Sequence, residues 1–176
     1  ADRAELRELR DEDAADANRM YTDPEVMRFI GRPPHKSIEE TREFVAKNRI
    51  QFPERQGIRW AMTLHGDDRL IGSCGHWRLM KEHNRAEIGY DMLREHWGKG
   101  LMEEALRAIL RWGFVDMELH STEAQIDPDN QRSRKVLLRL GFREDGRIRE
   151  NYFAEGRYTD TTIFTLLRRE FLNLSA

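Results

Sequence analysis

A glycine–lysine–glycine run at the start of an amphipathic segment carries the clearest chemical signal in the chain. Gly98, Lys99 and Gly100 precede the segment Leu101–Phe114, whose apolar residues recur at helical spacing. The first N–H groups of a helix have no intrahelical acceptor, and glycines leave them uncovered and permit positive φ. Such a helix start attracts a phosphate through aligned donors and the helix dipole. A tight turn explains the glycines equally well, so the run alone leaves both interpretations open.

A second polar pair lies further along the chain. Asn130 and Ser133 are three residues apart, which places them on one face of a predicted helix over 128–140. Asn130 is either a ligand-binding amide or the N-cap of that helix. The chain contains neither G-x-x-x-x-G-K-[ST] nor G-x-G-x-x-G, so a P-loop and a dinucleotide fingerprint are both absent.

Composition narrows the class of protein. The 176 residues suffice for one domain with its own core, and a charged fraction of 35% favours a soluble globular chain. We find no apolar run long enough to cross a membrane and no signal-peptide pattern. A net charge of -2 gives no argument for a nucleic-acid partner. The single cysteine, Cys74, suits a reducing cytoplasm, and the scattered histidines predict no metal site.

The elements that must position these residues alternate in type. We expect one strand, three helices, a run of three strands, a helix, a strand, a helix and two final strands. The segments 57–66, 69–80 and 85–93 are the three central strands, and 158–169 is the last strand. Ser37 with Glu40 predicts a capping box for the helix that follows, and Gly141 predicts the end of the helix 128–140. The pattern indicates an α/β (mixed α+β) fold with helices on both faces of a sheet.

Four short motifs in this order resemble one known family. They are AEIGYDML, WGKG, DNQRS and LGF, the last of which stands at the end of the predicted helix 128–140. Together they resemble the GCN5-related N-acetyltransferase (GNAT) superfamily, and most of all its subgroup that acetylates the N-termini of ribosomal proteins. The resemblance covers about residues 3 to 169 and is densest over 87–142. It implies a mixed, mostly antiparallel sheet and a single acyl-CoA N-acyltransferase domain over 1–176.

The resemblance also implies which residues hold acetyl-CoA. The strand before the glycine run would separate from its neighbour and offer its backbone to the pantetheine arm, and the loop would bind the pyrophosphate. The expected cofactor-binding residues are Asp91, Met92, Leu93, Trp97, Gly98, Lys99, Gly100, Leu101, Met102, Asn130 and Ser133. Trp97 and Met102 depart from the family's general loop pattern. Further candidates for contact with a phosphate are Arg94 and the basic residues at 132, 134 and 135.

Acetyl transfer to an amine requires a hydrogen-bond donor or acid for the departing thiolate and a base for the amine. Many family members use a tyrosine as the acid, but this chain has Leu137 at the equivalent position. Ser133 is the expected substitute, since the ribosomal-protein subgroup has serine there. Glu87, on the strand before the loop, is the expected base, although an exposed structural carboxylate explains it equally well.

Other candidate bases are less well supported by the sequence. Glu150, Tyr152 and Asp160 lie on the two final strands, where the family contacts the acceptor, and His76 lies on a central strand. Cys74 as a nucleophile has no supporting pattern, because a lone strand cysteine is usually core.

The sequence therefore predicts an N-acetyltransferase that moves an acetyl group from acetyl-CoA to a primary amine, with no metal. The acceptor is a protein N-terminus, ribosomal or other, or a small-molecule amine, and the chain is a monomer or homodimer. The alternative is a non-catalytic acyl-CoA-binding or regulatory domain of the same fold, which the loss of the usual tyrosine at Leu137 would explain.

Overall fold

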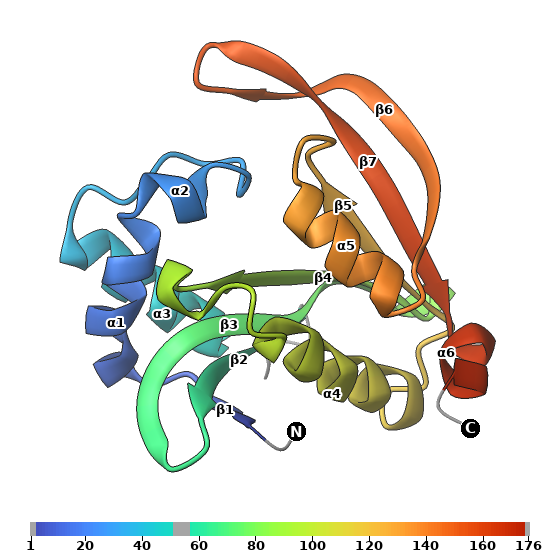
Figure 1. The fold of residues 1–176 in the computed structure, drawn as a ribbon, viewed down its shortest axis with the longest axis horizontal. Helices are drawn as coiled ribbons and strands as arrows, with labels where there is room; N and C mark the ends of the chain where they lie inside the picture. The colour runs from blue at the N-terminus through green and yellow to red at the C-terminus, as the bar shows by residue number, and fades with distance from the viewer. Residues whose placement is uncertain (1–2, 51–56, 175–176) are drawn as a thin grey trace.

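The computed structural model describes residues 3–50 and 57–174 and shows a curved sheet with helices on both sides (Figure 1). The strands are β1 (Ala4–Glu8), β2 (Gly57–Leu64), β3 (Asp67–Met80), β4 (Arg85–Met92), β5 (Ser121–Ile126), β6 (Arg143–Ala154) and β7 (Arg157–Leu167). The helices are α1 (Ala14–Tyr21), α2 (Pro24–Met27), α3 (Ile38–Ile50), α4 (Leu101–Val115), α5 (Gln131–Arg139) and α6 (Arg168–Leu174). Short 3₁₀ turns over 11–13, 81–83 and 94–96 connect some of them.

The strands form one seven-stranded sheet in the order β1-β2-β3-β4-β5-β7-β6. All pairs are antiparallel except β4 with β5, which is parallel. Helix α4 is the crossover between these two parallel strands, as a parallel connection requires. This mixed, mostly antiparallel sheet confirms the fold class expected from the sequence.

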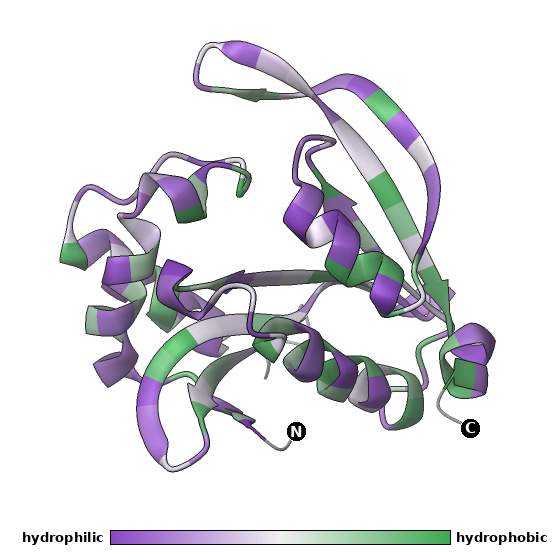
Figure 2. Cartoon of the chain, viewed as in Figure 1, coloured by the Kyte–Doolittle hydropathy of each residue, from purple (hydrophilic) through white to green (hydrophobic). Residues whose placement is uncertain are grey.

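Two hydrophobic cores fill the two faces of the sheet. One lies beneath α4, α5 and α6 and contains Leu106, Leu110 and Leu137. The other lies beneath α1, α2 and α3 and contains Met20 and Val45. Apolar and polar residues alternate along α4 and α5, visible as green and purple bands in Figure 2, because each helix buries only one face.

The strand β4 divides its side chains between these two layers. Ala86, Ile88 and Met92 belong to the core under α4 and α5. Leu93, which directly follows the strand, belongs to the core under α1 to α3. Because successive side chains in a strand point to opposite faces, Glu87 and Asp91 lie on the α1–α3 face. The strand therefore presents side chains to both layers of the fold.

Three sequence-based expectations about the elements change. The chain does not end in a strand: β7 stops at Leu167, and α6 follows, with the Glu170 carboxylate accepting the Leu167 N–H (3.1 Å) and Phe171 packing on Phe114 (5.3 Å between ring centroids). Only half of the expected capping box forms, because the Glu40 carboxylate accepts the N–H of Lys36 rather than that of Ser37. The strand expected over 158–169 begins one residue earlier and ends two residues earlier, at Arg157–Leu167, because α6 starts at Arg168.

Within the described residues, no helix has the length and apolar character that crossing a bilayer requires.

Candidate active site

A cleft of about 860 Å³ opens where β4 and β5 separate. The two strands pair only from Arg85↔Ser121 to Glu87↔Glu123, whereas β4 remains paired with β3 as far as Met92. The separation expected for this strand is therefore present. It leaves one edge of the second half of β4 without a strand partner.

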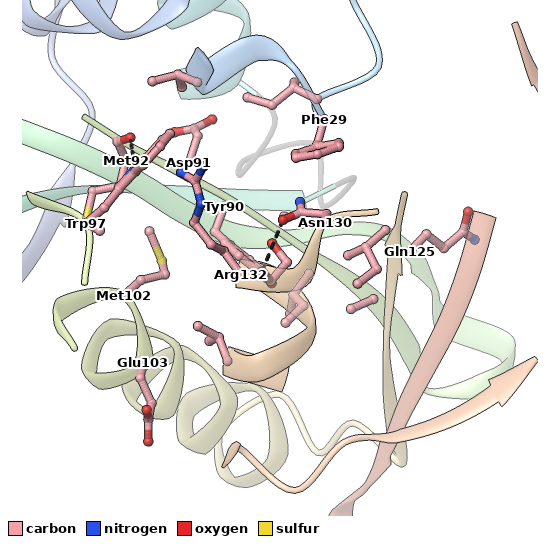
Figure 3. A pocket seen from close by; sticks show the side chains of 18 of the residues that line it. Phe29, Tyr90, Asp91, Met92, Trp97, Met102, Glu103, Gln125, Asn130 and Arg132 are labelled. Atoms are coloured by element: carbon pink, nitrogen blue, oxygen red, sulfur yellow. Dashed lines mark hydrogen bonds between the residues drawn. The ribbon is translucent and has the colours of Figure 1, made fainter. Parts of the chain in front are cut away.

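Backbone alternation shows which residues of β4 face this gap. The Leu93 N–H donates to the Ile71 carbonyl of β3 at 2.8 Å, so Leu93 directs its N–H away from the gap. In an antiparallel pair the main-chain groups of alternate residues point to opposite sides, so Asp91 also faces β3, and Tyr90 and Met92 face the gap. The Met92 carbonyl accepts one hydrogen bond there, from Trp97 Nε1 at 2.8 Å (Figure 3).

The loop before α4 has the geometry of an anion site. Gly98 and Gly100 adopt φ angles of 75° and 78°, the left-handed region that favours glycine, and Gly100 is the N-cap of the helix without a capping side chain. In the first hydrogen bond of the helix, the Glu104 N–H donates to the Gly100 carbonyl at 3.2 Å. The N–H groups of residues 101–103 therefore have no intrahelical acceptor.

Of the expected cofactor residues, most line the cleft and three do not. Those lining it are Asp91, Met92, Trp97, Gly98, Gly100, Met102, Asn130 and Ser133. Leu93 and Leu101 are buried in the two cores, and the exposed Lys99 has its carbonyl bound by Arg3 Nη1 at 3.0 Å. Arg3 also pairs with Glu104 (3.0 Å), a contact between distant parts of the chain that no local pattern predicts.

Two cations line the α5 side of the cleft without a carboxylate partner among the described residues. Arg132 stacks on the Trp97 ring, 4.0 Å from its centroid, and Lys135 lies one turn further along the helix. By contrast, Arg134 pairs with Glu144, and Arg94 pairs at 3.4 Å with Asp23, the N-cap residue of α2. Arg132 and Lys135 are therefore the basic residues available to a ligand here.

Helix α5 presents Ser133 to the cleft. The Asn130 side chain caps this helix, its Oδ1 accepting the Ser133 N–H at 3.2 Å, which leaves its amide NH₂ without a partner in the described chain (Figure 3). The Ser133 hydroxyl lies near that of Tyr90 on β4. Asn130 is therefore the N-cap of α5, and because a cap uses only one of its two polar groups, its amide NH₂ remains available to a ligand.

Tyr90 is the residue that sequence reasoning missed. Its hydroxyl is buried and has no hydrogen bond of ordinary geometry in the described chain. Burial raises the pKa of Tyr90 to about 12, and the nearby Ser133 hydroxyl opposes this rise. A buried hydroxyl without a partner costs free energy, so it marks a place where a ligand atom can bind. Alternation along the segment AEIGYDML was the available signal, since it places Tyr90 and Ile88 on one face.

Glu87 lines the cleft from the other face of the sheet and is only 7% exposed. Burial raises the pKa of Glu87 to about 7; the Arg78 guanidinium, 3.1 Å away, opposes this rise, and the neighbouring carboxylate of Glu123 adds to it. It is thus not the exposed strand carboxylate that the sequence allowed. A carboxylate that titrates near neutral pH suits a general base.

The remaining catalytic candidates lie elsewhere. His76 is buried toward α4, with Nε2 against the Ile109 carbonyl (2.9 Å), and burial lowers its pKa to about 4. Cys74 is a core residue, and burial raises its pKa to about 12. Leu137 is fully buried, and neither it, His76 nor Cys74 lines the cleft.

Two of the three late-strand candidates, Asp160 and Tyr152, have structural partners for their side chains. Asp160 pairs with Arg147 at 2.6 Å and accepts the Glu150 N–H at 2.8 Å. The Tyr152 hydroxyl donates to the Gly31 carbonyl at 2.5 Å. Among the described residues, histidine, cysteine, aspartate and glutamate side chains form no group of three or more suited to a metal ion.

Behind Asp91 lies a buried polar network. The Asp91 carboxylate accepts hydrogen bonds from Arg59 Nη2, from the Tyr21 hydroxyl (3.0 Å) and from the Ser73 hydroxyl (2.6 Å). Arg59 also donates from Nε to Ser73 at 2.8 Å. With its main chain directed at β3 and its side chain fully engaged, Asp91 supports the wall of the cleft.

Comparison with known proteins agrees with this geometry. Residues 3–143 match the family model described as "Acetyltransferase (GNAT) domain". The chain is 35% identical to the protein named "Uncharacterized N-acetyltransferase p20" of Bacillus licheniformis (97% of this chain, 96% of the relative). It is 25% identical to spermidine N(1)-acetyltransferase of Vibrio cholerae (97% and 96%).

Solved structures show the same fold. A GNAT-family acetyltransferase from Bacillus anthracis superposes with a TM-score of 0.87 at 27% identity (97% of this chain, 98% of that one). The spermidine N-acetyltransferase of Vibrio cholerae, solved with CoA and spermine, superposes with a TM-score of 0.85 at 24% identity (97% and 98%). With the family model spanning most of the chain and the sheet, glycine loop and strand separation in place, this chain belongs to the GNAT acetyltransferase family.

Proposed function

We propose that the chain transfers an acetyl group from acetyl-CoA directly to a primary amine within a ternary complex, acting as one acyl-CoA N-acyltransferase domain. The observation that carries this proposal is the single cleft that joins the glycine loop of α4 and Ser133 of α5 to Glu87 on the opposite face of the sheet. In this proposal acetyl-CoA occupies the α4–α5 side of the gap between β4 and β5, and the acceptor amine approaches from the side of Glu87. Direct transfer then needs no covalent enzyme intermediate.

The cofactor side of the proposal uses three parts of the cleft. The pyrophosphate would accept hydrogen bonds from the free N–H groups around Gly98, Gly100 and Met102. The pantetheine amides would pair with the open main chain of Tyr90 and Met92, in place of the expected Asp91 and Leu93, whose main chain faces β3. The free NH₂ group of Asn130, together with Arg132 and Lys135, would complete the site from α5.

The proposed chemical step is a direct attack of the amine on the thioester. The amine nitrogen attacks the thioester carbon, the C–N bond forms, and the C–S bond breaks to release CoA thiolate. Glu87, directly or through a water, takes the proton that the amine loses. Ser133 and Tyr90 donate hydrogen bonds to the departing sulfur, and the raised pKa of Tyr90 keeps its hydroxyl protonated as a donor at neutral pH.

The role of Glu87 gives a pH prediction. A base works only when ionised, so kcat/KM is expected to fall as pH decreases through about 7, the raised pKa of Glu87. Glu87→Gln should remove this acidic limb and lower the plateau by about a hundredfold or more, as expected for a lost general base. The measurement is kcat/KM between pH 5.5 and 9 with one acceptor.

Two neighbours provide matched controls for this profile. Glu123→Gln removes a carboxylate that raises the pKa of Glu87, and should move the limb to lower pH. Arg78→Gln removes the cation that opposes the rise, and should move it to higher pH. A limb that is the same in all four proteins would show that the base is another group.

The function itself is tested by binding and turnover. Calorimetry should show acetyl-CoA binding with a Kd of about 1 μM to 100 μM, and NAD should not bind. Acetylation of at least one amine among amino acids, peptides with free N-termini, aminoglycosides and polyamines should release free CoA thiol. No heat with acetyl-CoA would contradict the proposal.

A second candidate function is a non-catalytic acyl-CoA-binding or regulatory domain. The observation in its favour is Leu137, which occupies the position of the family's usual tyrosine and is buried in the core. Tight binding of acetyl-CoA with no turnover across the amine panel would favour this second function.

A further inference from the structure

Arg32 is a cation that the cleft holds in place without neutralising it. It lies in the connection between α2 and α3 and lines the cleft on the Glu87 face. Within residues 3–50 and 57–174 no carboxylate forms an ion pair with it. Its guanidinium instead stacks on two rings, 4.3 Å from the Phe44 centroid and 4.9 Å from that of Tyr21.

A hydrogen-bond chain fixes the orientation of this guanidinium. Arg32 Nη1 lies 2.9 Å from His35 Nε2, His35 Nδ1 lies 2.7 Å from the Thr41 hydroxyl, and that hydroxyl donates to Asn18 Oδ1 at 2.9 Å. Because Thr41 gives its only proton to Asn18, it accepts from His35 Nδ1–H, and Nε2 accepts from Arg32. Burial and the nearby Arg32 charge both lower the pKa of His35, which favours the neutral ring that this chain of bonds requires.

The connection that carries Arg32 is anchored on both sides. The Gly31 carbonyl accepts the Tyr152 hydroxyl from the β6–β7 hairpin, which reaches across toward α2 in Figure 1. The His35 N–H donates to the Tyr21 carbonyl at 2.8 Å. Gly31 has φ of 76°, and a Cβ there would lie 2.9 Å from the Tyr152 ring, so this close approach requires glycine. The guanidinium is thus preorganised before any ligand arrives.

The other charges on this side of the cleft do not compensate Arg32. Arg59 is neutralised by Asp91, and Glu87 is paired with Arg78. Lys47 and Glu25 also line the cleft, but both are exposed and form no ion pair in the described chain, so solvent screens their charges. An oriented guanidinium whose remaining donors have no partner in the described part of the chain matches the two oxygens of a carboxylate or a phosphate.

We infer that the acceptor is a primary amine bearing an oxyanion, carboxylate or phosphate, which Arg32 binds while the amine lies at Glu87. This inference rests on the proposed acetyl transfer and specifies its substrate class. A polyamine is then a poor acceptor for this chain, because its several positive charges would be repelled by the fixed positive charge of Arg32. Glu87 then accepts the amine proton at one end of the acceptor, and Arg32 positions the other end.

The experiment compares acceptors that differ only in the oxyanion. Amino acids are paired with their carboxamides, and O-phosphoethanolamine is paired with ethanolamine, with spermidine as the cationic acceptor. With the wild-type chain, kcat/KM should be tenfold to a hundredfold higher for the oxyanion member of the preferred pair, and spermidine should be poor. The better of the two pairs identifies carboxylate or phosphate.

Variants of Arg32 test whether that residue carries the preference. Arg32→Gln should raise KM for the oxyanion acceptor by about tenfold to a hundredfold, leave its neutral partner unchanged and keep acetyl-CoA affinity, while Arg32→Lys retains part of the preference. Arg42→Gln, on the exposed side of α3, should match wild type. Thermal unfolding of each variant checks that the fold is kept.

The outcomes separate this inference from the proposed function. Equal use of neutral and oxyanion-bearing acceptors, efficient use of spermidine, or an equal loss with both members of a pair in Arg32→Gln would overturn the role of Arg32 while leaving acetyl transfer intact. Absence of turnover with every amine would count against both, and absence of acetyl-CoA binding would defeat the proposed function directly.

Discussion

Ser133→Ala is expected to lower kcat by about tenfold to a thousandfold while acetyl-CoA affinity stays within about twofold, because one donor to the departing thiolate is lost. Tyr90→Phe should lower kcat by about tenfold to a hundredfold, since its hydroxyl lies beside that of Ser133 and has no hydrogen-bond partner among the residues that the structure describes. If the two hydroxyls act on one sulfur, the double variant should lose less than the product of the single losses.

Stability separates a catalytic Tyr90 from a structural one. Removing a buried hydroxyl that lacks a partner should leave the free energy of unfolding unchanged or slightly raised in Tyr90→Phe. Tyr21→Phe provides the contrast: its hydroxyl donates to Asp91 at 3.0 Å, so its loss should cost about 1–3 kcal/mol. The measurements are kcat at saturating acceptor, Kd by calorimetry and denaturant unfolding.

Two results would reject this assignment. A Ser133→Ala variant that loses acetyl-CoA affinity with kcat unchanged would make Ser133 a binding residue. A Tyr90→Phe variant that loses stability but keeps kcat would place the Tyr90 hydroxyl in the core rather than in the reaction.

Gly98→Asp is expected to weaken acetyl-CoA binding by tenfold or more. Gly98 has φ of 75°, a conformation that aspartate adopts more readily than most residues, and a Cβ there meets no atom within 4 Å. The added carboxylate would lie beside the free N–H groups at the start of α4 and repel the pyrophosphate. Because exposed charges are screened, the loss should shrink as ionic strength rises.

Matched variants isolate the charge from the side chain. Gly98→Asn has nearly the same shape without the charge and should bind acetyl-CoA more tightly than Gly98→Asp. Gly66→Asp changes another glycine at φ of 78° with open space around it, in the turn between β2 and β3, and should affect only stability. Equal weakening in Gly98→Asn and Gly98→Asp would indicate backbone strain instead of phosphate repulsion.

Local signals in the sequence were enough for most elements and for the conformation of the glycine loop before α4. The positive φ angles of Gly98 and Gly100 follow from residue type beside an amphipathic helix, and Gly141 ends α5 with φ of 93° for the same reason. The spacing of Asn130 and Ser133 placed both on one side of α5, and both line the cleft. These features depend on neighbours within a few residues, which a sequence displays directly.

Tertiary structure alone decided which polar groups are free. Asp91 looked like a cofactor residue, but Arg59 from a distant strand occupies its carboxylate, and pairing with β3 turns its main chain away from the gap. The sequence did not single out Tyr90 or Arg32. Within the described chain the Tyr90 hydroxyl has no hydrogen-bond partner, and Arg32 stacks on a ring and has no carboxylate to neutralise it. Helix α6 likewise depends on Phe171 meeting Phe114. Hydrogen bonding and burial are set by residues far apart in the chain, so periodicity and motif spacing carry no information about them.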